Sequence, residues 1–377
     1  MRIKVFLVFL LVLVVMVPAM FLNNVPNPKL SEAKVNQNHS IAERNPKPEE
    51  ISAFDFLQTK LQGRQGIISY LVDAKSPADY SVSESMGQAM EYAALLGDAE
   101  LFEKYAAITD KYFKHSTGYY YWKIDVASKK GETTSALVDD LRIVKAYFIA
   151  NEKKLGNYDK QIERLANAIY SFDVDANGYP CDYYDGAGKQ QANLVSMFYL
   201  DVETMEKLSR VNTRWSVPHK HAISILLNMP ENRYGFYPQT YKIDTKQYIW
   251  PSSINMVENL YTAMDAHSAG KSTDALVNFL KAQIKQGKVY NLYNSDGTPA
   301  TQDESTAVYA LAARFLALNK EQQAAEWCYR RTLDFQIDDK QGFVGGFGEP
   351  ETGLVYAFDQ LEALLMLRMV EIKNDSQ

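Results

Sequence analysis

The chain has 377 residues, of which 46% are hydrophobic and 23% charged, enough for one large single-core fold or two average domains. A net charge of −6 argues against nucleic-acid binding, which relies on basic patches. Two cysteines, Cys181 and Cys328, and five scattered histidines show no metal-binding spacing, so we expect no metal and no other cofactor. Whether the two thiols pair is left open.

The N-terminus combines a basic start, residues 1–4, with an apolar run from Val5 to Leu22 that meets no charge before Lys29. This pattern is typical of a secretory signal or of a membrane anchor whose basic end stays inside. The run is long for a signal and just long enough to cross a bilayer, and no Ala-x-Ala site follows it. We predict an uncleaved anchor over residues 1–24, with a cleaved signal as the alternative.

The remainder divides into a linker and one large domain. Residues 25–49 are rich in Asn, Pro, Lys and Glu and are predicted to be flexible. Residues 50–377 are predicted to form the domain, which lies outside the membrane. Long strand patterns are missing there, and helical apolar periodicity appears in eleven segments: 51–62, 83–97, 99–115, 134–152, 157–172, 192–210, 251–268, 272–286, 303–318, 320–336 and 354–372.

Glycine turns punctuate these helices at a near-constant period. Six glycines, each followed by aromatic or β-branched residues, recur at intervals of 52 to 60 residues: Gly66, Gly118, Gly178, Gly235, Gly287 and Gly342. Two helices fit between successive glycines, which indicates six helical hairpins. Closing them into a ring buries the face that each hairpin cannot bury alone. We therefore predict an all-α (α/α)6 barrel; the alternative is an open superhelical solenoid, which the lack of polar end caps disfavours.

The loops that follow the glycine turns are expected to open at one end of the barrel. They are rich in Tyr and Trp, whose flat rings match the C–H face of a pyranose, although such residues are also good core formers. We predict that sugar is bound by Gln88 on a nearby helix and by aromatic residues of this end: Tyr80, Tyr120, Trp122, Tyr183, Tyr184, Tyr237, Tyr248 and Trp250.

Glu84 is the first of three acidic positions that stand out, each in a different repeat. Ser83 is predicted to be the N-cap of a helix, which places Glu84 in its first turn. Glu84, Gln88 and Glu91 then share one stripe of this helix. The alternative interpretation is a capped helix with a solvated polar side.

Asp140 is the second acidic position. If Ser135 caps the helix that follows, Asp140 shares a stripe with Ile143 and Tyr147, and its carboxylate faces the apolar side. An inward carboxylate is costly unless it is paired or functional. The alternative is a hydrogen bond to a neighbouring helix end. Asp139 is expected in a surface pair with Arg142.

Asp244 is the third acidic position, in an aromatic loop on the predicted open end. Ordinary turn chemistry is the alternative explanation for an Asp in a loop. Taken together, the three positions fit glycoside hydrolysis, which needs an acid to protonate the leaving oxygen and a carboxylate on the other side of the sugar. In inverting enzymes the two carboxyl groups are roughly 6.5–9.5 Å apart.

Two segments carry a resemblance to a known family. Residues 83–90 (SESMGQAM) resemble the Ser-Glu-Gly-x-x-Tyr-Gly-Met motif that holds the general acid of glycoside hydrolase family 8, and residues 135–141 (SALVDDL) resemble its Ser-Ala-Ser/Thr-Asp-Ala-Asp-Leu segment. The resemblance covers residues 50–372 and implies the (α/α)6 fold. It is strongest to membrane-anchored exopolysaccharide hydrolases of Gram-positive bacteria, which are associated with biofilm matrix.

By this resemblance, Glu84 is the general acid, Asp244 the general base and Asp140 a residue that holds the sugar undergoing distortion. The sequence departs from the family at two places. Val138 replaces the first Asp of its segment, and residues 248–255 lie where the family has a Tyr-Asp and an Arg. A general acid must be protonated near neutral pH, so we expect burial against Met86, Tyr92 or a loop tyrosine to raise the pKa of Glu84.

The sequence therefore predicts a monomeric, extracellular, inverting endo-glycosidase that cleaves a secreted exopolysaccharide and is held at the cell membrane, or secreted if the N-terminal segment is cleaved. The alternative is a catalytically inactive toroid that binds polysaccharide at the cell surface. A lyase or epimerase is less favoured, because His115, His219, His221 and His267 fall in no matching motif.

Overall fold

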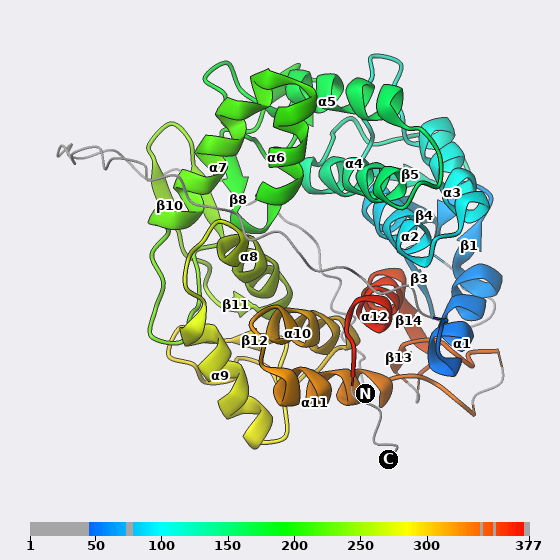
Figure 1. The fold of residues 1–377 in the computed structure, drawn as a ribbon, viewed down its shortest axis with the longest axis vertical. Coiled ribbons are helices and arrows are strands. Elements are labelled where there is room, and N and C mark those ends of the chain that lie inside the picture. Colours follow the sequence, from blue (N-terminus) through cyan, green and yellow to red (C-terminus); the bar gives the residue numbers. More distant parts are fainter. Residues whose placement is uncertain (1–44, 73–77, 340–341, 350–351, 373–377) are drawn as a thin grey trace. The chain divides into compact units, whose positions relative to one another are not determined.

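The computed structural model describes residues 45–72, 78–339, 342–349 and 352–372. Within these ranges twelve α-helices form two rings (Figure 1). The inner ring contains α2 (Ser83–Leu96), α4 (Leu137–Glu152), α6 (Val202–Val211), α8 (Met256–Ser268), α10 (Thr306–Leu318) and α12 (Ala357–Met369). The outer ring contains α1 (Pro48–Phe56), α3 (Ala99–Tyr112), α5 (Asp159–Asp173), α7 (Ser216–Asn228), α9 (Asp274–Lys285) and α11 (Gln322–Leu333).

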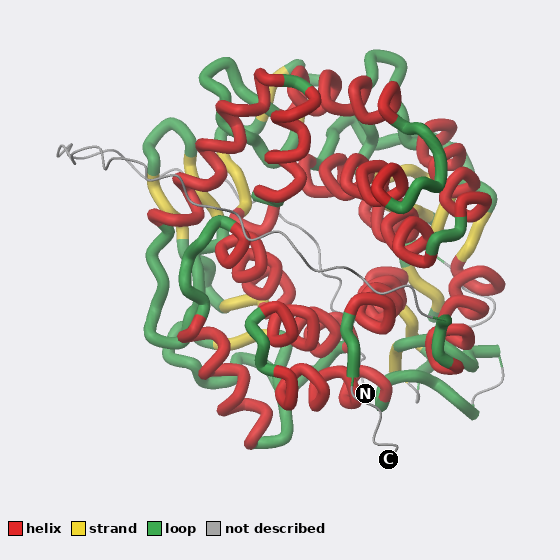
Figure 2. The backbone as a smooth tube through the Cα atoms, viewed as in Figure 1, coloured by secondary structure: helices red, strands yellow, loops and turns green. Residues whose placement is uncertain are grey.

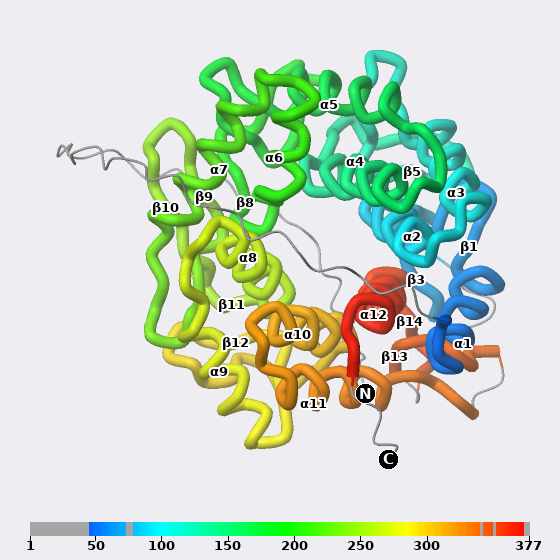
Figure 3. The backbone as a smooth tube through the Cα atoms, viewed as in Figure 1, coloured from blue at the N-terminus to red at the C-terminus, as the bar shows by residue number. Residues whose placement is uncertain are grey.

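The inner ring closes on itself. Each inner helix packs against the next one in the chain, and α12 returns to pack against α2. Figure 3 shows the same closure by colour, with the red last helix beside the blue and cyan first hairpin. The prediction of a mostly helical ring of hairpins agrees with this arrangement, and the open solenoid does not.

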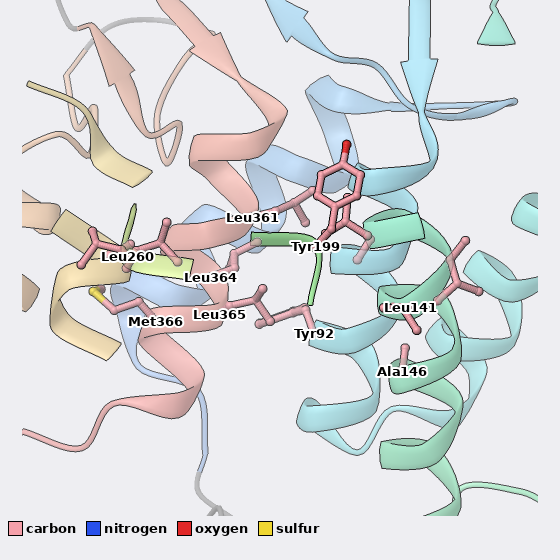
Figure 4. Close-up of a cluster of buried hydrophobic side chains, with 14 of the residues drawn as sticks. Tyr92, Leu141, Ala146, Tyr199, Leu260, Leu361, Leu364, Leu365 and Met366 are labelled. Carbon is pink, nitrogen blue, oxygen red and sulfur yellow. The ribbon is translucent and has the colours of Figure 1, made fainter. Parts of the chain in front are cut away.

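The two rings differ in burial because they have different neighbours. Outer helices are amphipathic: α5 buries Ile162, Leu165, Ala166 and Ile169 on one stripe. Inner helices lie between the outer ring and the other inner helices, so α12 buries ten of its thirteen residues, from Ala357 to Arg368. Figure 4 shows such a contact, where leucines of α12 face side chains of α2 and α4.

The six predicted glycine turns are present. Each glycine follows an outer helix and has a positive φ, from 74° at Gly235 to 136° at Gly66. Glycine tolerates this backbone region without the steric cost that other residues carry. Each turn leads into the loop before the next inner helix, so all inner helices start at the same end of the ring.

Short strands tie these loops together (Figure 2). Strand β4 (Tyr80–Val82) pairs with β5 (Lys123–Asp125), and β8 (Leu194–Ser196) pairs with β9 (Thr240–Lys242), which also pairs with β10 (Gln247–Ile249). Other pairs join β11 (Ile254–Asn255) to β12 (Leu292–Tyr293), β6 (Tyr184–Asp185) to β7 (Gln190–Gln191), and β1 (Gln62–Gly63) to β2 (Gly66–Ile67). The last repeat meets the first where β14 (Leu354–Tyr356) pairs with both β13 (Gly348–Glu349) and β3 (Tyr70–Leu71).

Two helix predictions needed correction. The segment predicted as one helix over 192–210 begins instead with β8 and a 3-10 turn, Met197–Tyr199, and becomes α-helical only at Val202. Helix α7 was not predicted at all. Its polar run His219-Lys220-His221 interrupts the apolar pattern, while Pro218 lies in the first turn, where proline is tolerated.

The predicted anchor, residues 1–24, lies outside the described residues, as does most of the predicted linker. Helix α1 begins at Pro48, so the structured domain starts slightly before the predicted boundary at residue 50. Among the described helices, none combines the length and the apolar character that a membrane span requires.

Cys181 and Cys328 are both buried and both free, which answers the question that the sequence left open. Burial raises the pKa of each thiol, so little of the reactive thiolate forms near neutral pH. We expect a thiol reagent such as Ellman's reagent to modify neither cysteine within minutes in the native protein and both after unfolding. Dithiothreitol should leave the melting temperature unchanged. A melting temperature that falls on reduction would contradict this.

Candidate active site

Acidic side chains gather where the inner helices begin. The first turns of α2, α4, α8 and α12 carry Glu84, Asp139 and Asp140, Glu258, and Asp359, respectively. A helix N-terminus carries a partial positive charge that favours nearby anions. Since all inner helices start at the same end of the ring, these carboxyl groups come from distant parts of the chain to one region.

Glu84 lies in the first turn of α2 and reaches solvent. Its side chain is 32% exposed, and it accepts a hydrogen bond within an ion pair from Arg142 of α4, whose side chain is 9% exposed. The apolar surroundings expected for Glu84 are therefore not observed, because the guanidinium of Arg142 contacts it directly. Arg142 also lies over the ring of Tyr261, 4.9 Å from its centroid, which holds the guanidinium in place.

Asp139 lies beside Glu84 and was wrongly expected in a surface pair with Arg142. It is buried, and its carboxylate accepts hydrogen bonds from the Ser83 hydroxyl, at 2.7 Å, and from the backbone N–H of Glu84. Asp139 of α4 thus caps α2, and the N-cap position itself is held by Val82 rather than by Ser83 as predicted. Burial, followed by the charge of Glu84, raises the pKa of Asp139 to about 7.

Asp140 faces Asp173, the last residue of α5, in the buried interior. The Ser135 hydroxyl, predicted to cap α4, instead donates to Asp173, and α4 begins only at Leu137. Burial and then the charges of Asp173 and Asp139 raise the pKa of Asp140 well above its ordinary value, and burial raises the pKa of Asp173 to about 7. The raised pKa values of both carboxyl groups favour a proton kept within this buried pair near neutral pH.

This pair makes stability depend on pH. The carboxyl groups titrate near pH 4 in the unfolded chain, so between about pH 4 and 7 the folded state binds more protons and the free energy of unfolding falls as pH rises. Asp140→Asn supplies a permanent amide N–H to Asp173. We expect this variant to reduce the loss of stability between pH 5 and 8 by on the order of 1–3 kcal/mol, measured by chemical denaturation.

A matched control is Asp334→Asn, which changes an exposed carboxylate paired with Arg331 and should leave the difference between pH 5 and 8 as in the wild type. A variant at Asp140 with the wild-type difference would show that the pair does not share a proton.

Two further buried polar side chains, Tyr199 and Asp182, interact electrostatically with these carboxyl groups. Burial, followed by the charges of Asp182, Asp139 and Glu84, raises the pKa of Tyr199 well above its ordinary value. Asp182, in turn, lies within the electrostatic range of Glu258, and burial raises its pKa to about 7. The carboxylate of Asp182 is held by the backbone N–H and the hydroxyl of Ser196, at the end of β8.

Glu258 lies in the first turn of α8, opposite α2 in the inner ring (Figure 1). It is half-buried beside a small hollow lined by Phe198, Tyr237 and Pro251. Its carboxylate accepts a hydrogen bond of 2.9 Å from Gln239, and burial raises its pKa. Glu258 is thus a second, partly exposed carboxyl group at the start of an inner helix.

Asp244 is not brought to Glu84. It occupies the exposed turn between β9 and β10, where hydrogen bonds from Asn193 and from the backbone of Thr245 lower its pKa. Figure 1 shows β10 at the outer edge of the ring beside α7, across the ring from α2. Among the described residues, no hydrogen bond or ion pair joins Asp244 to Glu84.

The residues predicted to bind sugar fall into two groups. Three are buried: Gln88 donates to Glu362 at 2.6 Å, Tyr120 donates to Asp110, and Tyr237 is 2% exposed. The others remain accessible in part, and these are Tyr80, Trp122, Tyr183, Tyr184, Tyr248 and Trp250. Tyr80 lies in β4, just before α2, and Trp122 directly precedes β5, the strand that pairs with β4. The two rings share the ammonium of Lys123, which lies 4.8 Å and 5.7 Å from their centroids.

The candidate site that we describe adds four residues to those predicted from the sequence: Arg142, Asp139, Tyr199 and Glu258. The signal for Glu258 was present, because it follows an N-cap asparagine, Asn255, as Glu84 follows its own helix start. The groups that interact with Arg142 and Tyr199 come from other repeats, so no local sequence pattern identifies these two residues. Within the described chain, no group of three or more His, Cys, Asp or Glu residues is arranged to hold a metal ion.

Comparison with known proteins places this site in context. No protein-family model matches the chain. The putative lipoprotein YdaJ of Bacillus subtilis (strain 168) is 29% identical over 344 residues, which cover 90% of this chain and 91% of YdaJ. A solved α-amylase from Clostridium perfringens is 26% identical with a TM-score of 0.78, covering 86% of this chain and 98% of the amylase.

More distant structures share the fold alone. PssZ from Listeria monocytogenes is 22% identical with a TM-score of 0.69, covering 88% of this chain and 97% of PssZ. A family 8 glycoside hydrolase from Teredinibacter turnerae, solved with xylobiose, is 15% identical with a TM-score of 0.60, covering 85% and 91%. A D-mannose isomerase and a sugar epimerase have similar scores, so several carbohydrate-active enzymes share this architecture.

Proposed function

We propose that the chain is a glycoside hydrolase that cleaves a polysaccharide outside the cell membrane. The observation that carries this proposal is the position of Glu84, a solvent-accessible carboxylate in the first turn of an inner helix, fixed by Asp139 and Arg142. The similarity to an α-amylase at 26% identity and the fold shared with a family 8 enzyme support it. Membership of family 8 itself is part of the proposal.

In the proposed reaction, Glu84 donates a proton to the glycosidic oxygen, and the bond from this oxygen to the anomeric carbon breaks. Glu258, on the opposite helix, accepts a proton from a water molecule, which attacks the anomeric carbon from the other face and inverts it. Glu258 replaces Asp244 as the proposed base, because Asp244 occupies the exposed turn between β9 and β10, and Figure 1 shows β10 at the outer edge of the ring.

A general acid needs a proton to donate, and the partner that Glu84 contacts is the guanidinium of Arg142, which cannot supply one near neutral pH. Asp139 contacts the start of α2 and has a pKa of about 7, so it holds a proton for part of the population at neutral pH. We propose that this proton reaches the leaving oxygen through Glu84 once a bound sugar excludes water. Asp139 is then a positioning residue and a proton source that does not touch the substrate.

Asp140 is proposed to have a structural role in the buried interior, behind the side chains that reach solvent. Both of its carboxylate oxygens are buried, and they face Asp173 instead of solvent. A sugar held at the rim is therefore contacted by the accessible aromatic residues, in particular Tyr80 and Trp122, rather than by Asp140. The apolar N-terminal segment and the similarity to a putative lipoprotein of Bacillus subtilis support the extracellular location that we propose.

An isomerase or epimerase is the competing function on this fold. Such enzymes act at a sugar C–H with a base that is usually His, Tyr or Lys. His115 lies in the loop after α3, His219 and His221 on the outer helix α7, and His267 in the last turn of α8. These four lie away from the starts of the inner helices, which favours the hydrolase.

The test is to replace Glu258 by Gln and to measure reducing ends released from soluble starch, mixed-linkage β-glucan and xylan. We expect the released sugar to fall by about 10²–10⁴-fold relative to the wild type on whichever polysaccharide is cleaved. Asp244→Asn is the matched control and should retain activity. If Asp244→Asn abolishes turnover and Glu258→Gln does not, the assignment of the base is reversed.

A further inference from the structure

A second aromatic pocket lies on the outer side of the ring, between α7, the β9–β10 hairpin and the loop after α5. Its volume is about 210 Å³, and its lining includes Tyr179, His221, Tyr241 and Tyr248. Helix α7 and β10 lie side by side at the outer edge in Figure 1, away from α2. The pocket is thus separate from the acidic groups at the starts of the inner helices.

One stripe of α7 forms the floor of this pocket. His221, Ser224, Ile225 and Asn228 line it, with the spacing of residues that share one helix face. The hydroxyl of Tyr248 donates to the backbone oxygen of Ile225 at 2.7 Å, which fixes the hairpin against the helix. The walls are therefore held in place before any ligand arrives.

The rings in the pocket are ordered against one another. Tyr179 stacks on His221 with centroids 3.8 Å apart and planes 13° apart, and His221 is itself bonded through Nδ1 to the backbone oxygen of Gly178 at 3.0 Å. Tyr241 and Tyr248 pack 5.0 Å apart at 59°. A stacked pair with a second tilted pair beside it offers flat apolar surface at a low cost in conformational entropy.

The polar groups of the lining suit hydroxyl groups. Ser224 and Asn228 are exposed on α7, and Lys246 is exposed at the hairpin. None of the residues that line the pocket is an Asp or Glu, so the pocket has no carboxyl pair for hydrolysis. Flat rings combined with hydroxyl, amide and ammonium donors are the chemistry that recognises a sugar ring.

The size of the pocket limits the ligand. A volume of about 210 Å³ is below the 300–1,000 Å³ of pockets for drug-sized ligands, which suits one ring-sized unit. Ile249, 39% exposed, ends β10, and Trp250, 41% exposed, follows it, so two exposed apolar side chains come directly after Tyr248 of the pocket in the chain. A polymer can therefore place one unit in the pocket and continue across this face.

We propose that this pocket is a non-catalytic binding site for one pyranose unit of a polysaccharide chain. This inference rests on the proposed function only to the extent that both require the protein to bind a polysaccharide. Its role is to hold the polymer on the outer face of the ring while the acidic site acts on another part of the same chain or on a neighbouring one. Binding and hydrolysis are then separable by mutation.

The experiment is affinity electrophoresis of the full-length protein in native gels that contain soluble starch, mixed-linkage β-glucan or xylan. The Glu84→Gln background prevents digestion of the gel. We expect retardation in at least one gel, and Tyr179→Ala to raise the apparent dissociation constant about five- to ten-fold. Tyr112→Ala, which removes a partly exposed ring at the end of the outer helix α3, is the matched control and should match its parent within two-fold.

A second variant tests whether weaker binding by Tyr179→Ala could result from misfolding. Ser224→Arg fills the pocket from an exposed position on α7 and should also weaken the retardation at least five-fold, while the melting temperature stays near that of the parent. Retardation that is unchanged from the parent in both variants, or no retardation of the parent in any of the three gels, overturns the proposal.

The proposed function is judged separately, by reducing ends released with Glu84 intact. Tyr179→Ala should leave the cleavage of a short oligosaccharide unchanged, because such a substrate does not reach the pocket. If the protein binds polysaccharide through Tyr179 but cleaves none of the three substrates, the binding site is supported and the proposed hydrolase function is refuted.

Discussion

Replacing Glu84 by Gln is expected to lower turnover by about 10²–10⁴-fold while the affinity for polysaccharide changes little. The amide has the shape of the carboxylate but cannot donate the proton that the leaving oxygen needs. Because the side chain is partly exposed, the substitution should not unfold the protein. The measurement is release of reducing ends, with binding followed by affinity electrophoresis and folding by circular dichroism.

The matched control is Glu203→Gln, in the first turn of α6, the inner helix after α4. Glu203 is exposed and accepts a hydrogen bond from Ser268 instead of facing Arg142, so its loss should leave turnover unchanged. An equal loss of turnover in both variants would mean that the negative charge at the starts of the inner helices acts electrostatically, with no specific role for Glu84. Unchanged turnover in Glu84→Gln would support the inactive, sugar-binding toroid.

Replacing Glu362 by Gln is expected to cost about 3–5 kcal/mol of the free energy of unfolding, the largest stability effect that we predict. Glu362 is fully buried in α12, where it accepts hydrogen bonds of 2.6 Å from both Gln88 and Arg314, and a further one from Tyr261. Gln removes the charge that compensates Arg314, whose side chain is 9% exposed. Denaturant unfolding measures the loss.

Glu206→Gln is the control for this prediction. It removes one partner of an i,i+4 ion pair with Arg210 on the surface of α6, where a loss of about 0.3–0.5 kcal/mol is typical. If Glu362→Gln and Glu206→Gln cost the same, the buried network is not what stabilises the centre of the ring. Glu362→Gln should also change the position of Arg142, because Tyr261 donates a hydrogen bond to Glu362 and its ring contacts the guanidinium of Arg142.

The architecture was largely predictable because it repeats. Positions such as Gly118 and Gly287 need a positive φ, and the regular spacing of such glycines fixes the number of hairpins without any knowledge of contacts. Helix α7 escaped prediction since its apolar pattern is weak, and its outer position needs only Ala222, Ile225 and a few others to be buried. Short strands such as β8 were missed because two or three residues carry too little pattern.

Residues of the candidate site could be predicted only where the local sequence pattern identifies them. Glu84 follows a helix start, and its neighbourhood in the sequence is distinctive. The group that contacts it, Arg142, belongs to another repeat, and so does Asp139, which takes the capping role assigned to Ser83. Asp244 was chosen for its aromatic loop, but loop composition does not tell on which side of the ring the loop lies.

The most direct test of the central claim is to incubate the full-length protein with soluble starch, mixed-linkage β-glucan and xylan and to follow the products by proton NMR within the first minutes. A hydrolase that uses Glu84 and Glu258 should release sugar whose first anomer is inverted relative to the linkage cleaved, and Glu84→Gln should release none in the same time. Sugar released at equal rates by the wild type and by Glu84→Gln, or a first product with retained configuration, would contradict it.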